Sequence, residues 1–272
     1  GDAEAFVAEV GLPLVLKPPA GMGCKSTWRI GSLDELRAAL RALHASPERP
    51  ALAEEFLRGR EYSFETITIG GQVRFQSCSR YYPTPLEVME TPWIQWVVVL
   101  PRDIDGPEFA DARALGVKAV AALGLETGFT HMEWFSKPSG EVVFGEIGCR
   151  PGGAHLVDQM NYTCDIDLFR EWARVSCWGS FEAPTTRKYN VAIIFKRARG
   201  QGRITRITGL REFLRAHGEH VVESKLLPVG AQRRNWKQTL VSDGYILLRH
   251  PDWRTAVELA NIVATDVTMY AE

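Results

Sequence analysis

The chain has 272 residues, of which 45% are hydrophobic and 24% are charged, and its formal net charge is −1. This composition is typical of a folded globular protein, and the near-zero charge predicts no general polyanion-binding surface, so no nucleic-acid partner is expected. No apolar run approaches membrane-spanning length, so no membrane association is expected either. Five cysteines without C-x-x-C spacing predict reduced thiols and a cytoplasmic protein.

The length suits two lobes that share one cleft, or one large α/β domain. The sequence starts at Gly1, without an initiator Met and without the basic and apolar parts of a signal peptide. We therefore expect a fragment or a processed form of a longer protein.

The first expected lobe, residues 1–57, contains two short strands at 13–17 and 27–30, joined by a loop rich in Gly and Pro. A capping box that begins at Ser32 predicts the start of an amphipathic helix. A strand that runs into a linker is expected over residues 51–57.

The second expected lobe, residues 58–185, is mixed, and its stretch 79–94 is expected to be irregular. Its predicted elements are strands at 62–69 and 72–78, a helix at 107–123, strands at 129–135 and 141–147, and a helix at 167–178.

The remaining residues, 186–272, are predicted to form a β-rich subdomain that ends in a helix. Its predicted elements are strands at 189–197, 203–208, 221–229 and 245–248, a short helix at 210–216, and a final helix from about Asp252. The predicted class is α+β.

One predicted hairpin carries a glutamate on each strand. If Ser139 and Gly140 form a two-residue turn, Glu133 lies directly opposite Glu146, with Cβ atoms roughly 5 Å apart. On the period-two rule, Glu146 shares its side of the strand with two apolar residues, Val142 and Phe144.

Two opposed carboxylates repel each other unless a positive charge lies between them. Oxygen-only ligands favour Mg²⁺ or Mn²⁺, which also bind substrate phosphates. The Glu133 and Glu146 pair therefore suggests a metal site, although a solvated acidic face is an equally open interpretation of the hairpin by itself.

Directly after Glu146 the chain reads Ile-Gly-Cys-Arg-Pro-Gly-Gly-Ala-His. Arg150 offers a planar fork of donors for phosphate or carboxylate oxygens. Gly152 and Gly153 let the backbone approach a ligand closely, and His155 is placed to orient a substrate. A plain turn with a surface arginine is the alternative.

Lys17 stands at the end of the first strand, and the loop after it contains Gly21, Gly23 and Ser26. Glycines free backbone N–H groups to bind phosphates, and a lysine at a strand end can reach the α- and β-phosphates. The loop matches neither the P-loop nor the dinucleotide fingerprint, and an ordinary β-turn is the alternative.

The segment Glu54, Glu55, Phe56 and Leu57 is a strand that enters an apolar linker, so its backbone can bond the edge of an adenine. Glu61 follows closely and is placed to bind ribose hydroxyls. An exposed acidic pair without a ligand is the alternative.

Taken in this order over residues 11–180, these segments resemble the ATP-grasp superfamily. The resemblance lies in the Lys-Pro strand with its glycine loop, in Glu-Glu-Phe-Leu-x-Gly-x-Glu, in His-Met-Glu-Trp-Phe at 131–135, and in Glu-x-x-x-Arg-Pro-Gly-Gly at 146–153. It implies an α+β ATP-grasp fold, in which two lobes grip ATP and Mg²⁺ bridges its phosphates. The Arg-Pro-Gly-Gly form and the β-rich tail are most similar to amino-acid and dipeptide ligases.

By position, the resemblance implies that Glu133 and Glu146 bind the metal. It implies that Arg150 stabilises the transferring phosphoryl group, and that Gly152, Gly153 and His155 contact the substrate. The ATP-binding residues that it implies are Lys17, Gly21, Gly23, Ser26, Glu54, Glu55, Phe56, Leu57 and Glu61.

Two positions depart from the family pattern. Gly148 stands where many members have an Asn that binds metal, which leaves the number of metal ions open. Ala154 stands where bicarbonate-activating members have a Glu, which argues against that chemistry.

We therefore predict an ATP-dependent, ADP-forming ligase that joins a carboxylate to an amine through an acyl phosphate, with an amino acid or related carboxylate as substrate. The alternatives are a non-catalytic nucleotide-binding module of a larger assembly, and an ATP-grasp kinase or phosphotransferase.

Overall fold

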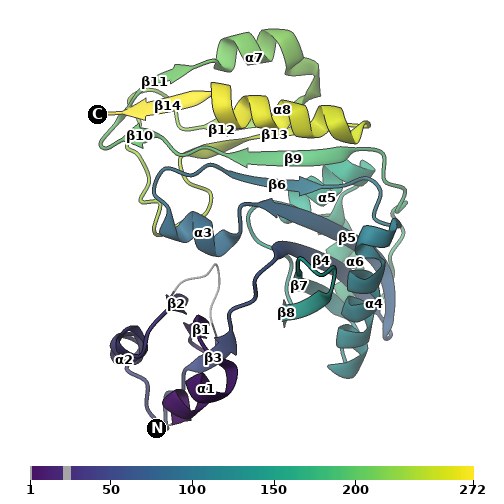
Figure 1. Cartoon of the computed structure of the whole chain (residues 1–272). Helices are drawn as coiled ribbons and strands as arrows, with labels where there is room; N and C mark the ends of the chain where they lie inside the picture. Colours follow the sequence, from purple (N-terminus) through teal and green to yellow (C-terminus); the bar gives the residue numbers. More distant parts are fainter. Residues whose placement is uncertain (1, 21–25) are drawn as a thin grey trace. The chain divides into compact units, whose positions relative to one another are not determined.

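The computed structural model describes residues 2–20 and 26–272, and the chain divides into two compact units, Gly1–Arg58 and Gly59–Glu272. Figure 1 follows the chain through both units, from purple to yellow. In the described residues, no helix combines the length and the apolar character needed to cross a membrane.

Unit 1 is a three-stranded antiparallel sheet of order β2-β1-β3 with helices α1 and α2. Its elements are α1 (Asp2–Val10), β1 (Leu14–Lys17), β2 (Trp28–Ile30), α2 (Leu33–Ala42) and β3 (Leu52–Glu55). Leu14 and Leu16 alternate onto one face of β1 and are buried against Leu36 of α2. Ser32 caps α2 by accepting a hydrogen bond from the Glu35 backbone N–H at 3.2 Å, as the capping box predicts.

Unit 2 is built on an eight-stranded antiparallel sheet of order β12-β13-β9-β6-β5-β4-β7-β8. The strands are β4 (Arg60–Ile69), β5 (Gln72–Tyr82), β6 (Trp96–Leu100), β7 (Gly128–Ser136), β8 (Val142–Gly148), β9 (Asn190–Phe195), β12 (Val221–Leu226) and β13 (Gly244–His250). A smaller sheet joins β10 (Arg199–Gly200), β14 (Thr268–Ala271) and β11 (Ile204–Thr208).

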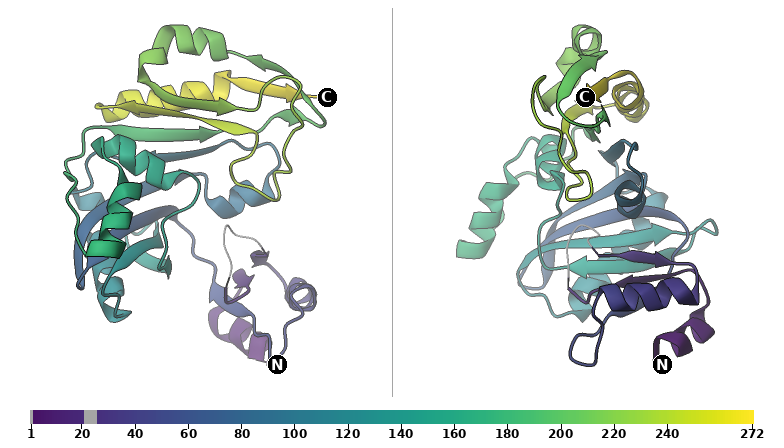
Figure 2. Two further views of the ribbon diagram at one scale, coloured as in Figure 1. Left: turned by 180° about the vertical axis from the view of Figure 1, so that it is seen from behind. Right: turned by 90° about the vertical axis from the view of Figure 1, so that its left-hand side faces the viewer.

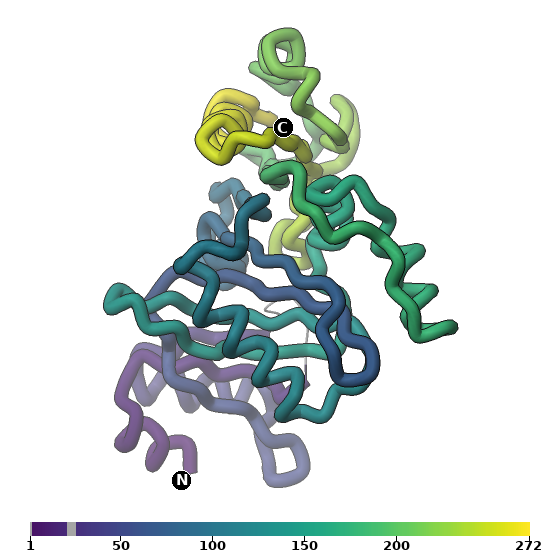
Figure 3. The backbone as a smooth tube through the Cα atoms, turned by 90° about the vertical axis from the view of Figure 1, so that its right-hand side faces the viewer, coloured from purple at the N-terminus to yellow at the C-terminus, as the bar shows by residue number. Residues whose placement is uncertain are grey.

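Helices cover both faces of the large sheet. They are α3 (Pro85–Glu90), α4 (Pro107–Ala122), α5 (Leu156–Cys164), α6 (Leu168–Trp178), α7 (Leu210–His217) and α8 (Trp253–Asp266). The α5–α6 pair buries its apolar side with Phe129 of β7 and Leu100 of β6. On the other face, α4 packs over β4 and β7, and α8 packs over β9 and β13 (Figures 2 and 3).

The strands expected in a separate 186–272 subdomain belong to the same sheet as β4 to β8, so residue 185 is not a boundary between compact units. The reason lies in β9, in which all six residues, Asn190 to Phe195, are buried. A strand buried on both faces must lie in the interior of a sheet, and β9 pairs with β6 on one side and β13 on the other.

One stretch that was expected to be irregular is ordered, and one helix, α5, had no predicted counterpart. Residues 79–94 were expected to be irregular, but β5 extends to Tyr82 and α3 follows, with Thr84 accepting a hydrogen bond from the Glu87 backbone N–H at 3.3 Å. The stretch after Gly153 forms α5, which buries Leu156 and Met160. The cap at Thr84 stabilises α3, and the buried apolar residues stabilise α5.

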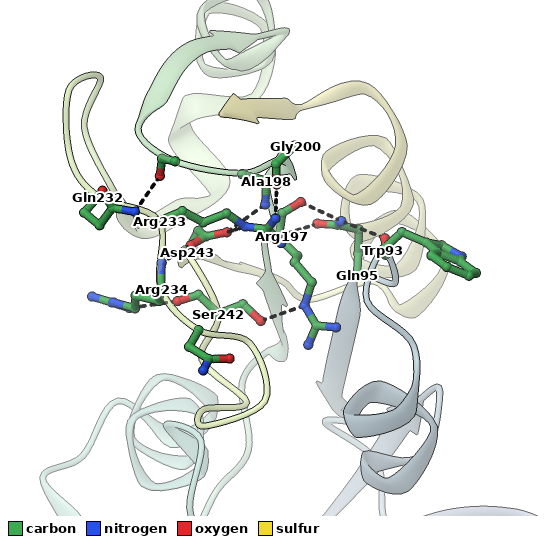
Figure 4. A network of polar contacts seen from close by, with 12 residues as sticks. Trp93, Gln95, Arg197, Ala198, Gly200, Gln232, Arg233, Arg234, Ser242 and Asp243 are labelled. Atoms are coloured by element: carbon green, nitrogen blue, oxygen red, sulfur yellow. Dashed lines mark hydrogen bonds and ion pairs between the residues drawn. The ribbon is translucent and has the colours of Figure 1, made fainter. Parts of the chain in front are cut away.

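A long connection between β12 and β13 is fastened to the end of β9, which is why β12 ends at Leu226 and not at 229 as predicted. Asp243 accepts hydrogen bonds from the backbone N–H groups of Ala198 and Arg234, both at 2.8 Å, and from Nε of Arg233 at 3.2 Å (Figure 4). Arg197 lies two residues after the end of β9. Its Nη1 donates to the carbonyl oxygen of Thr91, the residue that follows α3, at 2.6 Å.

Candidate functional site

The β7–β8 hairpin places Glu133 directly opposite Glu146, as predicted. The expected turn is wrong, however: the loop is one residue longer, since Lys137 N–H bonds to the carbonyl oxygen of Glu141 at 2.9 Å. A β-bulge at Gly145 then shifts the register by one residue between Trp134 and Glu133. The longer loop and the bulge shift the register in opposite directions, so Glu133 and Glu146 are still paired as predicted.

The bulge also means that the side chains of β8 do not all lie on the predicted faces of the sheet. Phe144 pairs with Trp134, and Val142 packs in the α4-side core that contains Trp134. Glu146 pairs with Glu133 and therefore faces the other side of the sheet. Val142 and Phe144 were expected beside Glu146, but the extra residue in the bulge turns them away from it.

Glu61 of β4 joins the same side as the acid pair. It lies opposite Phe135 in the β4–β7 register and is buried, with 7% of its surface exposed. Burial raises the pKa of Glu61 well above its usual range, and the charges of Glu133 and Glu146 raise it further. Tyr81 responds in the same way, since burial and then the Glu133 charge raise its pKa.

His131 lies between two carboxylates on this surface. Its Nδ1 is 2.9 Å from Oε1 of Glu65, and its Nε2 is 3.5 Å from Oε1 of Glu133. Burial of the ring favours the neutral form, but the hydrogen bonds to Glu133 and Glu65 outweigh it and raise the pKa of His131 to about 9. The imidazole therefore carries a positive charge next to the acid pair at neutral pH.

The Arg-Pro-Gly-Gly turn follows β8 and lies against His131. The Arg150 side chain folds back over Gly148, and its Nη1 donates to the carbonyl oxygen of Pro151 at 3.0 Å. A Cβ on Gly152 would stand 3.1 Å from Nδ1 of His131, so only a glycine lets this turn pack so closely. Around Gly153 the space for a Cβ is open.

His155 begins α5 in a left-handed backbone conformation, with φ of 60°, and Ala154 before it has φ of 49°. Two successive left-handed residues other than glycine are costly, and such strain is concentrated at functional sites. The His155 ring is fixed by Asp158, with Nδ1 2.8 Å from Oδ2, and by Tyr245, at 4.4 Å between ring centroids. This cluster forms a polar edge beside the turn.

Within unit 1, Lys17 ends β1 and forms an ion pair with Glu54 of β3, with Nζ 2.9 Å from Oε2. Glu55 ends β3, and Phe56 lies 4.6 Å beneath the guanidinium of Arg29. The next residue of the predicted hinge, Leu57, is part-exposed and precedes the boundary between the units.

The predicted glycine loop is described only at its end. Ser26 has a left-handed φ of 59°, a conformation typical of turns. Gly21 and Gly23 lie outside the described residues.

Arg80 is on the opposite face of the sheet from Glu133, where it pairs with Glu108 and lies 4.5 Å from the Trp253 ring. Cys149 is an exposed free thiol beside Arg150. The residue that the sequence analysis missed is Glu65. Its signal was a charged residue in the middle of a long predicted strand, and fully buried charged residues almost always have a partner.

The donor set fits a divalent cation that is also bound by a ligand. Mg²⁺ is usually held in proteins by one or two carboxylates plus substrate phosphates, and Glu133 and Glu146 supply two oxygen donors on one face. No group of three or more acidic, histidine or cysteine side chains in the described part of the chain is arranged to hold a metal by itself.

No family model matches the chain. The chain is similar to the L-arginine-specific L-amino acid ligase of Bacillus subtilis, with 27% identity over 182 residues, which are 65% of this chain and 43% of that protein. An L-amino acid ligase from Bacillus licheniformis has the same fold, with a TM-score of 0.77 and 20% identity over 98% of this chain and 66% of that one.

A third match is the biotin carboxylase domain of a Hydrogenobacter thermophilus 2-oxoglutarate carboxylase, solved with MgADP and bicarbonate. Its TM-score is 0.69 at 17% identity, covering 98% of this chain and 61% of that one. The chain thus spans less than half of the Bacillus subtilis ligase and slightly less than two thirds of the solved structures.

The architecture and these matches show that the chain has an ATP-grasp fold. The chain is similar to amino-acid ligases. The predicted α+β ATP-grasp fold is confirmed.

Proposed function

We propose that this chain is the nucleotide- and substrate-binding part of an ADP-forming ligase that joins a carboxylate to an amine, with an amino acid as the carboxylate substrate. The observation that carries the proposal is the opposition of Glu133 and Glu146 at the strand end that leads into Arg150. The similarity to two L-amino acid ligases supports the substrate class.

The proposed reaction has two steps. A substrate carboxylate oxygen attacks the γ-phosphorus of ATP, and ADP leaves, which gives an acyl phosphate. The amine then attacks the acyl carbon, loses a proton and displaces inorganic phosphate. Arg150 supplies N–H donors to the phosphoryl oxygens, where negative charge spreads during the transfer.

Glu133 and Glu146 are the proposed ligands of Mg²⁺, or of Mn²⁺, which would neutralise phosphate charge when bound. Lys17, Glu61 and the hinge from Glu54 to Leu57 remain the proposed nucleotide ligands. Gly152, Gly153 and His155 are proposed to contact the substrate, because they belong to the turn that directly follows Arg150 and leads into α5. A cytoplasmic location and a homodimer or an upstream domain belong to the same proposal.

The test is a screen of amino acids, singly and in pairs, for ADP formation by the chain and by the full-length gene product that contains it. ADP formation that requires an added amino acid and yields phosphate supports the ligase. A stable phosphorylated product would instead indicate a kinase or phosphotransferase.

A second candidate is a non-catalytic nucleotide-binding module, and Gly148 is the observation that favours it, because the position offers no oxygen ligand. Binding of ATP without turnover under every acceptor pair, in the full-length product as well, would select this candidate over the ligase.

A further inference from the structure

A carboxylate without any exposed surface lies in the middle of β4. Glu65 is 0% exposed, and in the β4–β7 register it lies directly opposite His131. Its Oε1 is 2.9 Å from Nδ1 of His131, while its Oε2 has no hydrogen-bond partner among the described residues. The contact with His131 is therefore the main interaction that compensates for burying this charge.

The imidazole of His131 is held on its other sides as well. Its Nε2 lies 3.5 Å from Oε1 of Glu133, and the Gly152 backbone packs against the ring. The plane of the ring is thus set by Glu65 and by the turn after β8, and it directs Nε2 to Glu133. Glu133 itself is 21% exposed, so its carboxylate can reach a ligand while it is held from behind.

Burying two ionisable side chains against each other is costly, and apolar residues of similar volume would often be neutral or stabilising at such a place. On the opposite face, the same two strands are joined by a simpler contact, in which the hydroxyls of Thr66 and Thr130 bond to each other at 2.5 Å. The contact between Glu65 and His131 differs in that it continues, through Nε2 of His131, to the carboxylate of Glu133.

We propose that Glu65 and His131 are positioning residues, which fix the carboxylate of Glu133 in the orientation that binds the metal–nucleotide. The inference rests on the proposed function, because it requires Glu133 to be a metal ligand. Partners behind metal ligands commonly change metal affinity or activity by about 10- to 100-fold when they are removed. The chain from Glu65 through His131 to Glu133 has the same arrangement.

The experiment exploits the two nitrogens of His131. The amide of a glutamine reaches the position of Nε2, which faces Glu133, whereas the amide of an asparagine reaches the position of Nδ1, which faces Glu65. Mn²⁺ is titrated, in the presence of a non-hydrolysable ATP analogue, into the wild type, His131→Ala, His131→Gln and His131→Asn, and the melting temperature of each chain is recorded. Thr130→Val is the control, because it removes a buried polar contact from the same strand without touching Glu133.

We expect His131→Ala to weaken Mn²⁺ binding by about 10- to 100-fold. His131→Gln should recover most of that loss, and His131→Asn should not. Glu65→Gln should weaken binding in the same direction, and its effect should not add to that of His131→Ala, because both act through one contact. The KM for MgATP should rise in parallel.

If Glu65 and His131 only stabilise the fold, asparagine at position 131 should restore more than glutamine does. Asparagine would then restore the melting temperature, and Mn²⁺ affinity would follow it or stay at the wild-type value in all variants. Either result would overturn the proposal, and so would a wild-type chain that binds no Mn²⁺. Failure of the ligase assignment has a different signature: the order of Mn²⁺ affinities is retained, but no amino acid stimulates ADP formation.

Discussion

Gly145 lies so close to Glu133 that a Cβ at Gly145 would stand 2.8 Å from the carbonyl oxygen of Glu133. This approach forms the bulge that turns Phe144 to one face of the sheet and Glu146 to the other. The opposition of Glu133 and Glu146 thus depends on a residue that has no functional side chain of its own.

Gly145→Ala should push the two strands apart at the bulge, since the clash is with backbone that cannot rotate away. We expect a loss of about 1–3 kcal/mol in the free energy of unfolding, as for other overpacked sites. Mn²⁺ affinity should fall with it, because Glu133 and Glu146 lose their register. Gly218→Ala, which meets open space, should change neither quantity, and a Gly145→Ala chain with wild-type Mn²⁺ affinity would contradict the role of the bulge.

Glu146→Gln keeps the size of the side chain and removes its charge. The side chain is exposed, so the melting temperature should not change. Metal ions contribute several kcal/mol to charge stabilisation, so Mg²⁺-dependent ADP formation should fall by about 100-fold or more. Glu141→Gln, in the turn of the same hairpin, is the control and should retain activity. Normal turnover by Glu146→Gln would show that the metal assignment is wrong.

Gly148→Asn would add an oxygen donor next to the acid pair. A Cβ there meets only the Arg150 side chain, at 3.4 Å from Cγ, which is an ordinary contact, so the fold should tolerate it. Since Mg²⁺ and Mn²⁺ take oxygen ligands, we expect Mn²⁺ to bind several-fold more tightly. Gly148→Ala fills the same space without an oxygen. Equal affinities in the two variants would exclude a metal site within reach of this position.

Lys196 should give the stability of unit 2 a distinct pH dependence. Its Nζ is buried and donates to the carbonyl oxygens of Val263 and Ala264, at 2.9 Å each, at the end of α8. Burial lowers the pKa of Lys196 from 10.5 to about 8, so between these values the unfolded chain binds more protons than the folded chain. The contribution of Lys196 to the free energy of unfolding is therefore smallest below about pH 8, and it increases as the pH rises toward 10.5.

The measurement is the urea midpoint of wild type and Lys196→Met across that pH range, followed by tryptophan fluorescence. Other titrating groups are common to both chains, so the wild type should gain stability relative to the variant as the pH rises. Parallel pH profiles would mean that Lys196 keeps its proton in the folded state.

Several features could be predicted from the sequence because they depend on neighbours along the chain. The capping box at Ser32 and the helix at 107–123 depend on residues within a turn or two of each other. The Glu133 and Glu146 pair was predicted from one hairpin, and it survived an error in the turn because the bulge compensated for it.

The position of β9 and the partner of His131 could not be found in this way. Glu65 and His131 are 66 residues apart in sequence, and they meet only because β4 lies beside β7. Alternation along a strand says which residues share a face, but it does not say which strand lies next to it.

By itself, then, the sequence determined the residue types of the site and the local elements that carry them. The tertiary structure decided the strand order, and with it the buried contact that joins Glu65 to Glu133 through His131. The physical reason is range: caps, turns and alternation are set by bonds between near neighbours, whereas strand order is set by burying apolar faces from distant parts of the chain together.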